Sequence, residues 1–158
     1  MILLKLFGVC FLLLSGVFAA FTVTWYEKKK VAVLAGWSDL IWYIRAQIDC
    51  YLLPLPEILA KADGALFEAC SCRQPAPDIE TVFRASQRYL DPEARRLLSA
   101  LVREFSLGNR QELLSRCDYY ITALGRLRTK KMEDLPAKSR IAAAICIGSA
   151  LLVVILLW

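Results

Sequence analysis

The chain has a long apolar stretch at each end and amphipathic patterns between them. No charged residue occurs at positions 6–24, and only Lys5 interrupts the apolar run that begins the chain. Positions 141–158 also carry no charge, and their 18 residues would cover about 27 Å as a helix. A helix needs about 20 apolar residues to cross the hydrocarbon core of a bilayer. The pattern therefore predicts transmembrane helices at residues 1–25 and 141–158, with a domain at residues 26–140 between them.

Apolar residues in the first half of this domain recur at helical spacing. The first helix has a seam with steps of three and four residues, formed by Leu34, Trp37, Ile41, Ile44, Ile48 and Tyr51. It should end before Pro54, because a residue that precedes proline is disfavoured in the α region. Pro56 suits the first position of a second helix, with Glu57 near the positive end of its dipole. The apolar stripe of that helix is Ile58, Ala62, Leu66 and Ala69.

The second half of the domain predicts three more helices. Asp78 can cap the first of them, whose buried face would be Ile79, Val82, Phe83, Ser86 and Leu90. The run Asp91-Pro92-Glu93 marks the next start, and Gly108 can close that helix. A last seam, made up of Leu113, Cys117, Tyr120, Leu124 and Leu127, leads toward the second apolar stretch. Pro136 should kink or break the helix there. We therefore predict an all-α protein, an antiparallel bundle of about five helices flanked by two transmembrane helices.

Composition supports a membrane protein without familiar catalytic chemistry. Of 158 residues, 58% are hydrophobic, which is high for a soluble domain of this length. There is no histidine, so Ser-His or Cys-His pairs and histidine-ligated zinc are excluded. The glycines do not form a phosphate-binding loop, and the Cys70-Ser71-Cys72 pair lacks the spacing of zinc ligands. We expect no enzyme activity, no metal and no cofactor.

Basic residues predict the topology. Of the 20 lysines and arginines, all except Lys5 lie at positions 25–140. Those beside the apolar stretches, which we expect to set topology and contact lipid, include Lys28, Lys29, Lys30, Lys130 and Lys131. The positive-inside rule places the central domain in the cytoplasm, so Cys50, Cys70, Cys72 and Cys117 would be thiols. The net charge of +5 is explained by this pattern, and we expect no nucleic acid partner.

An alternative is that the first stretch is a secretory signal peptide. Lys5, the apolar run and the small residues near Ala19 and Ala20 resemble its three regions. Cleavage would leave an exported domain with a C-terminal anchor, in which the four domain cysteines could form two disulfides. Lys28–Lys30 would then follow the cleaved segment on the outer side of the membrane, against the usual charge rule.

Two regions are candidates for contact with a protein partner. Trp42 falls off the apolar seam beside Tyr43, and an exposed Trp-Tyr pair would favour binding, although packing inside the bundle is the alternative. The turns far from the membrane are the second region, and antiparallel helices should bring them together. Their candidate residues are Pro54, Pro56, Glu57, Gly108 and Arg110. The two prolines also have a purely structural reading, since they end one helix and begin another.

The outline of two apolar ends around a helical domain resembles the stage III sporulation protein AB family. Leu40, Ile44 and Ile48, followed by Tyr51 and the run Pro54-Leu55-Pro56-Glu57-Ile58-Leu59, are similar to one of its segments. Leu107-Gly108, with Gln111 shortly after, is similar to its turn before the last long helix. Lys131-Met132 resembles its approach to the terminal membrane helix. Pro136 stands where that family usually has glycine.

This resemblance implies a component of the mother-cell membrane complex of an endospore-forming bacterium. The family assembles with other stage III sporulation membrane proteins into a channel-like apparatus between mother cell and forespore. Its cytoplasmic domain is similar to the helical domain of type II secretion and type IV pilus platform proteins, which couple a hexameric ATPase to the membrane. By analogy, the partner would be an ATPase like stage III sporulation protein AA. The alternatives are a platform subunit of a secretion or pilus system and a small membrane enzyme, which the uncharged apolar stretches disfavour.

Overall fold

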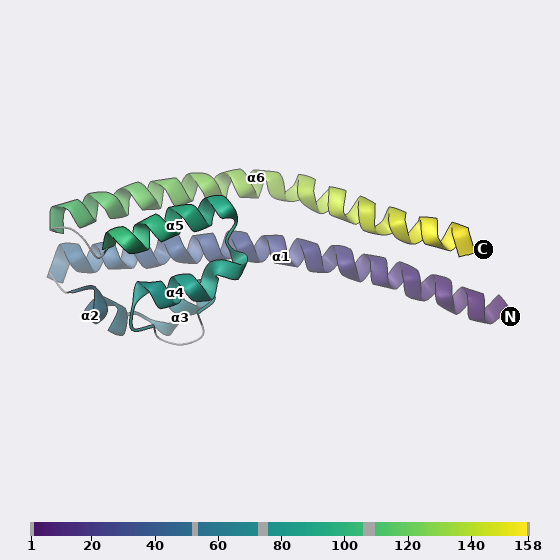
Figure 1. The fold of residues 1–158 in the computed structure, drawn as a ribbon, viewed down its shortest axis with the longest axis horizontal. Helices are drawn as coiled ribbons and strands as arrows, with labels where there is room; N and C mark the ends of the chain where they lie inside the picture. Colours follow the sequence, from purple (N-terminus) through teal and green to yellow (C-terminus); the bar gives the residue numbers. More distant parts are fainter. Residues whose placement is uncertain (1, 52–53, 73–75, 106–109, 158) are drawn as a thin grey trace. The chain divides into compact units, whose positions relative to one another are not determined.

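The computed structural model describes residues 2–51, 54–72, 76–105 and 110–157 (Figure 1). These residues form α1 (Ile2–Tyr51), α2 (Leu55–Ala60), α3 (Gly64–Ala69), α4 (Ile79–Ser86), the 3-10 helix η1 (Gln87–Tyr89), α5 (Pro92–Phe105) and α6 (Arg110–Leu157). No strand occurs in this part of the chain, so the all-α class is confirmed. The chain divides into two compact units. Lys29–Lys131 form the central unit, and the residues up to Lys28 join those from Met132 onward in the other.

In the central unit, α1 and α5 both run antiparallel to α6. Arg110 at the start of α6 donates hydrogen bonds to backbone oxygens in the last turn of α1. Glu104 at the end of α5 contacts Arg116 and Tyr120, whereas Asp91 just before α5 contacts Lys131 much later in α6. Figure 1 shows α5 lying along the first half of α6. The three helices therefore form the frame on which the shorter helices pack.

The core of the central unit follows the predicted seams closely. In α1 the buried residues include Leu34, Trp37, Ile41, Ile44 and Ile48. Tyr51 was predicted as part of the buried seam, but it is the last residue of α1 and is 67% exposed. The buried seam therefore ends at Ile48. Every residue of the predicted α4 face is buried: Ile79, Val82, Phe83, Ser86 and Leu90.

One polar pair is buried within this core. Trp37 Nε1 donates a hydrogen bond to Ser86 Oγ at 3.1 Å, and that hydroxyl donates to the Phe83 carbonyl oxygen at 2.9 Å. Both side chains are fully buried, so each hydrogen bond replaces one that water would otherwise supply. The pair fixes the position of α4 against α1.

The single helix predicted between Pro56 and Ala69 is wrong. The chain turns at 61–63, and Asp63 Oδ1 accepts a hydrogen bond from Ala65 N at 3.1 Å, which starts α3 as a separate helix. The turn brings Phe67, which the predicted stripe omitted, into the core at 1% exposure. It also seats α3 tightly on α1: a Cβ added at Gly36 would lie 2.5 Å from the Ala69 carbonyl carbon.

The end of α3 has a backbone conformation that usually needs glycine. Ser71 has a φ of 64°, and its N–H donates to the Glu68 carbonyl oxygen while Cys72 N donates to Phe67 O, both at 2.8 Å. This is a Schellman motif, whose left-handed position is usually glycine. The Ser71 Oγ is buried and makes no hydrogen bond. Serine is therefore strained at this position.

The predicted break at Pro136 does not occur, since α6 continues as a helix to Leu157. Proline removes one hydrogen bond, and long helices tolerate such a loss with local bending.

Among the described residues, one helix, α6, is long and apolar enough to cross a membrane. In the unit that contains the chain ends, the half-buried residues of α1 include Gly16, Ala20 and Thr24.

The two helices meet there at small side chains. Thr24 Oγ1 and Ser139 Oγ share a hydrogen bond of 3.1 Å, and on α6 Ala142 and Cys146 are also half-buried. The close approach is of the kind that small residues allow. Ala144 and Gly148, which also have small-residue spacing, are instead exposed.

Candidate interaction surface

Trp42 lies on the surface of the central unit, with its ring against the side chain of Arg45. Its side chain is 54% exposed, whereas the neighbouring Tyr43 is half-buried and packs against the core. The Arg45 guanidinium lies 5.6 Å from the centre of the Trp42 ring, within reach of a cation–π interaction. The exposed member of the predicted Trp-Tyr pair is therefore Trp42 alone.

Arg45 is itself fixed by α6. Its Nε donates to Asp118 Oδ1 at 2.5 Å and its Nη2 to Asp118 Oδ2 at 3.2 Å. Such a two-point contact sets the plane of the guanidinium as well as its position. The hydrogen bond with Asp118 raises the pKa of Arg45. Trp42 thus rests on an arginine that joins two helices, so the ring is presented by a rigid support.

The same face continues toward the end of α1. A polar cleft lies beside Arg45, and it is lined by Asp49, Arg110, Gln111, Glu112, Leu114, Ser115 and Asp118. We call Trp42, Arg45, Asp118, Asp49 and Arg110 together the α1–α6 face. It combines one large exposed aromatic ring with charges of both signs, the composition that protein-binding surfaces favour at their centre and rim.

Arg110, a predicted binding residue, closes the end of α1. Its Nε donates to the Ile48 carbonyl oxygen at 3.2 Å, and its Nη2 donates to the Asp49 carbonyl oxygen at 2.5 Å. The last carbonyls of a helix have no partner within it, so Arg110 has a structural role at this point. The contact also brings the start of α6 against the last turn of α1.

The other predicted residues of the distal turns are exposed. Pro54 precedes α2 in an extended conformation, Pro56 lies in its first turn, and Glu57 follows as the acidic residue there. All three are on the surface. Gly108 lies outside the described residues.

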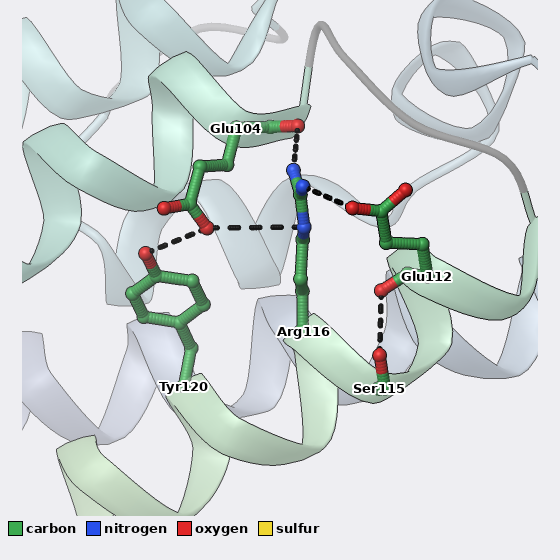
Figure 2. A network of polar contacts seen from close by, with 5 residues as sticks. All are labelled: Glu104, Glu112, Ser115, Arg116 and Tyr120. Carbon is green, nitrogen blue, oxygen red and sulfur yellow. Dashed lines mark hydrogen bonds and ion pairs between the residues drawn. The ribbon is translucent and has the colours of Figure 1, made fainter.

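A second arginine of α6 closes α5 in the same way (Figure 2). Arg116 Nη1 donates to the Glu104 carbonyl oxygen at 2.9 Å, and its Nη2 donates to Glu112 Oε1 at 2.5 Å. Tyr120 Oη donates to Glu104 Oε2 at 3.0 Å. Burial, with this hydrogen bond, raises the pKa of Tyr120 to about 12. Sequence reasoning missed the network because Glu104 lies on α5, whereas Arg116 and Tyr120 lie on α6, and the periodic pattern of one helix does not show which residues of the next helix it meets.

The predicted lipid-contacting lysines have different surroundings. Lys28 and Lys130 are exposed, and Lys29 Nζ lies 5.9 Å from the centre of the Tyr89 ring. Lys30 Nζ lies 3.3 Å from Asp91 Oδ1, and Lys131 donates a hydrogen bond to Asp91 Oδ2. Asp91 therefore joins α1 to α6, a role that its place before a helix start did not indicate.

The described cysteines of the central unit form no disulfide with one another, and three of them are buried. Cys70, Cys72 and Cys117 lie in the core, whereas Cys50 is exposed. Burial raises the pKa of Cys70 to about 12 and that of Cys117 to about 11. Since the thiolate is the reactive form, these two thiols are inert near neutral pH.

Comparison with known families supports the resemblance seen in the sequence. No curated protein and no solved structure is significantly similar to the chain. The model of one family, described as stage III sporulation protein AB, matches residues 5–158. The match covers both apolar stretches and the whole helical unit between them. The chain therefore belongs to the stage III sporulation protein AB family.

Proposed function

We propose that this protein is a non-enzymatic, membrane-anchored scaffold that docks a cytoplasmic ATPase onto the stage III sporulation membrane complex. The ATPase would be one like stage III sporulation protein AA, and the complex would include other stage III sporulation membrane proteins. Family membership supports the sporulation role. The docking role rests on analogy with secretion platform proteins, in which a similar helical domain couples an ATPase to the membrane.

The observation that carries the proposal is the setting of Trp42. Exposed tryptophan and arginine side chains contribute most often to binding energy at protein interfaces. Here the two are stacked, and Asp118 holds the arginine in place. Because the support is already ordered, a partner that covers Trp42 pays little entropy to order it. We propose the α1–α6 face as the ATPase contact, together with Glu57 on the exposed surface of α2.

We propose two spans, at residues 1–25 and 141–158, in the mother-cell membrane, with the central unit in the cytoplasm. The apolar composition of α6 and the hydrogen bond between Thr24 and Ser139 support a helix pair in the bilayer. The exposed Lys28 and Lys130 would lie near its anionic headgroups. A platform subunit of another secretion system has the same surface requirements, but family membership favours sporulation.

The test is capture of purified stage III sporulation protein AA by the full chain in lipid nanodiscs. Trp42→Ala should weaken capture by at least about tenfold, since a central tryptophan commonly contributes 2 kcal/mol or more. Tyr119→Ala is the matched control, because Tyr119 is also an exposed aromatic residue, at 63%, and it lies on another face. Glu57→Lys should weaken capture, while Glu68→Lys, on exposed α3 surface, should not.

Two results would count against the proposal. Equal capture by Trp42→Ala and the native chain would remove the α1–α6 face as the contact. The absence of capture by the native chain in any lipid tested would remove the docking role itself. Arg110 is unsuitable for charge reversal here, because its loss would open the end of α1.

A further inference from the structure

A long groove runs between α5 and α6 on a different face of the central unit. Its volume is about 1320 Å³, and it extends from Pro92 to Glu104 along α5 and from Tyr119 to Lys130 along α6. At about 1.5 Å per residue, the α5 side is about 18 Å long. Small-molecule pockets are usually enclosed and smaller than about 1000 Å³. The open shape and the length suit a helix of a partner protein.

The floor of the groove is apolar and includes two short side chains. Leu97, Ala100, Ala123 and Leu127 line it, and Leu127 belongs to the buried core while the others are half-buried or packed against it. The two alanines lie between the contact of Asp91 with Lys131 at one end of the pair and that of Glu104 with Tyr120 at the other, nearer to the second. Short side chains at this point let a third helix approach closely, as in other helix-in-groove complexes.

The rim of the groove is positively charged on both sides. Arg96 stands on the α5 side, and Arg126 and Lys130 stand one turn apart on the α6 side. All three are exposed, and none forms an ion pair with a carboxylate among the described residues. Glu93 is the acidic residue that lines the same end, while Glu104 is engaged by Tyr120 and Arg116.

We infer that the α5–α6 groove binds an amphipathic helix of a protein partner, with an apolar stripe against the alanine floor and acidic residues along both flanks. The floor would bury the stripe, and the three cations would pair with the flanking carboxylates. A second copy of this chain is a poorer occupant through the same face, because it would place cations opposite cations.

The test uses the full chain in nanodiscs of zwitterionic phosphatidylcholine. The probe is a fluorescent alanine-leucine peptide of about 18 residues, long enough to be partly helical, with glutamates flanking its leucine stripe. Its companion has lysines in place of the glutamates. Fluorescence anisotropy should show binding of the glutamate peptide, weakening in high salt, and at least about tenfold weaker binding of the lysine peptide.

Two pairs of variants locate the contact. Arg126→Glu should weaken binding by at least about tenfold, whereas Arg103→Glu makes the same charge change on exposed α5 surface outside the groove and should not. Ala123→Trp should fill the floor and block binding, whereas Ala46→Trp, on the exposed surface of α1, should not. In every variant, continued protection of the buried Cys117 thiol from alkylation shows that the unit is folded.

Several outcomes would overturn the inference. These are no binding of the glutamate peptide to the native chain, equal binding to Arg126→Glu and Arg103→Glu, or unchanged binding to Ala123→Trp. Loss of a dimer in Arg126→Glu, with no peptide effect, would identify a second copy as the occupant. If Arg126→Glu weakens binding to phosphatidylglycerol vesicles but leaves peptide binding unchanged, the occupant would be lipid. None of these outcomes depends on Trp42, so a failure of the groove proposal would not count against the ATPase proposal.

Discussion

Replacing Gly36 with alanine tests the close approach of α1 and α3. The added Cβ would lie 2.5 Å from the Ala69 carbonyl carbon and 2.7 Å from its oxygen. Carbon atoms prefer separations of about 3.5 Å or more, so the helices must move apart by about 1 Å. Both contacting atoms belong to the backbone, which cannot turn aside as a side chain does. Overpacking of this kind costs about 1–3 kcal/mol.

Alanine also stabilises a helix relative to glycine, and a control variant, Gly125→Ala, separates this effect from the clash. Alanine is favoured over glycine inside a helix by about 1 kcal/mol. At Gly125 in α6, an added Cβ has no atom within 4 Å, so Gly125→Ala should gain this stabilisation without a clash. Because both substitutions carry the same helix preference, the difference between them isolates the contact with Ala69. We expect Gly36→Ala to be less stable than Gly125→Ala by about 1–3 kcal/mol.

The assay is urea unfolding of the full chain in nanodiscs, followed by alkylation of Cys117. This thiol is fully buried in the folded unit, so its labelling reports unfolding of the central unit and not of the membrane segments. Peptide mapping separates it from the exposed Cys50. If both glycine variants raise the unfolding midpoint equally, α3 does not lie against Gly36 and the packing described for it is wrong.

Four further predictions concern other parts of the chain. Ser71→Gly should stabilise the central unit by about 1 kcal/mol in the same assay, because glycine adopts the positive φ without strain, and a loss of stability would refute the Schellman geometry. Ser86→Ala should destabilise it by about 1–3 kcal/mol, since Trp37 Nε1 would be buried without an acceptor, whereas an unchanged midpoint would exclude that hydrogen bond. Burial holds the pKa of Tyr120 at about 12 in the folded chain, above the ordinary value of about 10 for tyrosine. The neutral hydroxyl of Tyr120 therefore contributes fully to the stability of the central unit below pH 10, and this contribution is lost as the pH rises toward 12. Tyr120→Phe should make the fall in stability over that pH range less steep. A reporter that is active only outside the cytoplasm should stay silent when fused after Gly64, and strong activity would revive an exported domain.

The sequence predicted the starts of helices correctly where a single capping residue or proline marks them. Asp78 accepts a hydrogen bond from Thr81 N at 2.8 Å, as a capping aspartate should, and α5 begins at Pro92. The α2–α3 break was missed because the apolar stripe continued across it. Asp63 followed by Gly64 was the available signal, since an aspartate that caps a new helix outweighs a continuous pattern.

The candidate surfaces were harder to predict, because they depend on partners distant in sequence. Periodicity alone placed Trp42 off the buried seam, and it is exposed. Nothing near Arg110 or Arg116 indicated that each would close the end of another helix. The α5–α6 groove was missed for a related reason: Ala100 and Ala123 have weak hydrophobic signals, and a groove exists only once two such positions face each other.

The arginine contacts between α1 and α6 have a consequence for folding during synthesis. Arg110 reaches the Ile48 carbonyl across 62 positions of the chain, and Arg45 reaches Asp118 across 73. Contacts of such long separation form late. While the ribosome is still translating α5, the side of α1 that α6 will cover has no partner within the nascent chain. The central unit can therefore close only after the first half of α6 has emerged, so ribosome-bound chains that end before α6 should be preferred substrates for chaperones and proteases.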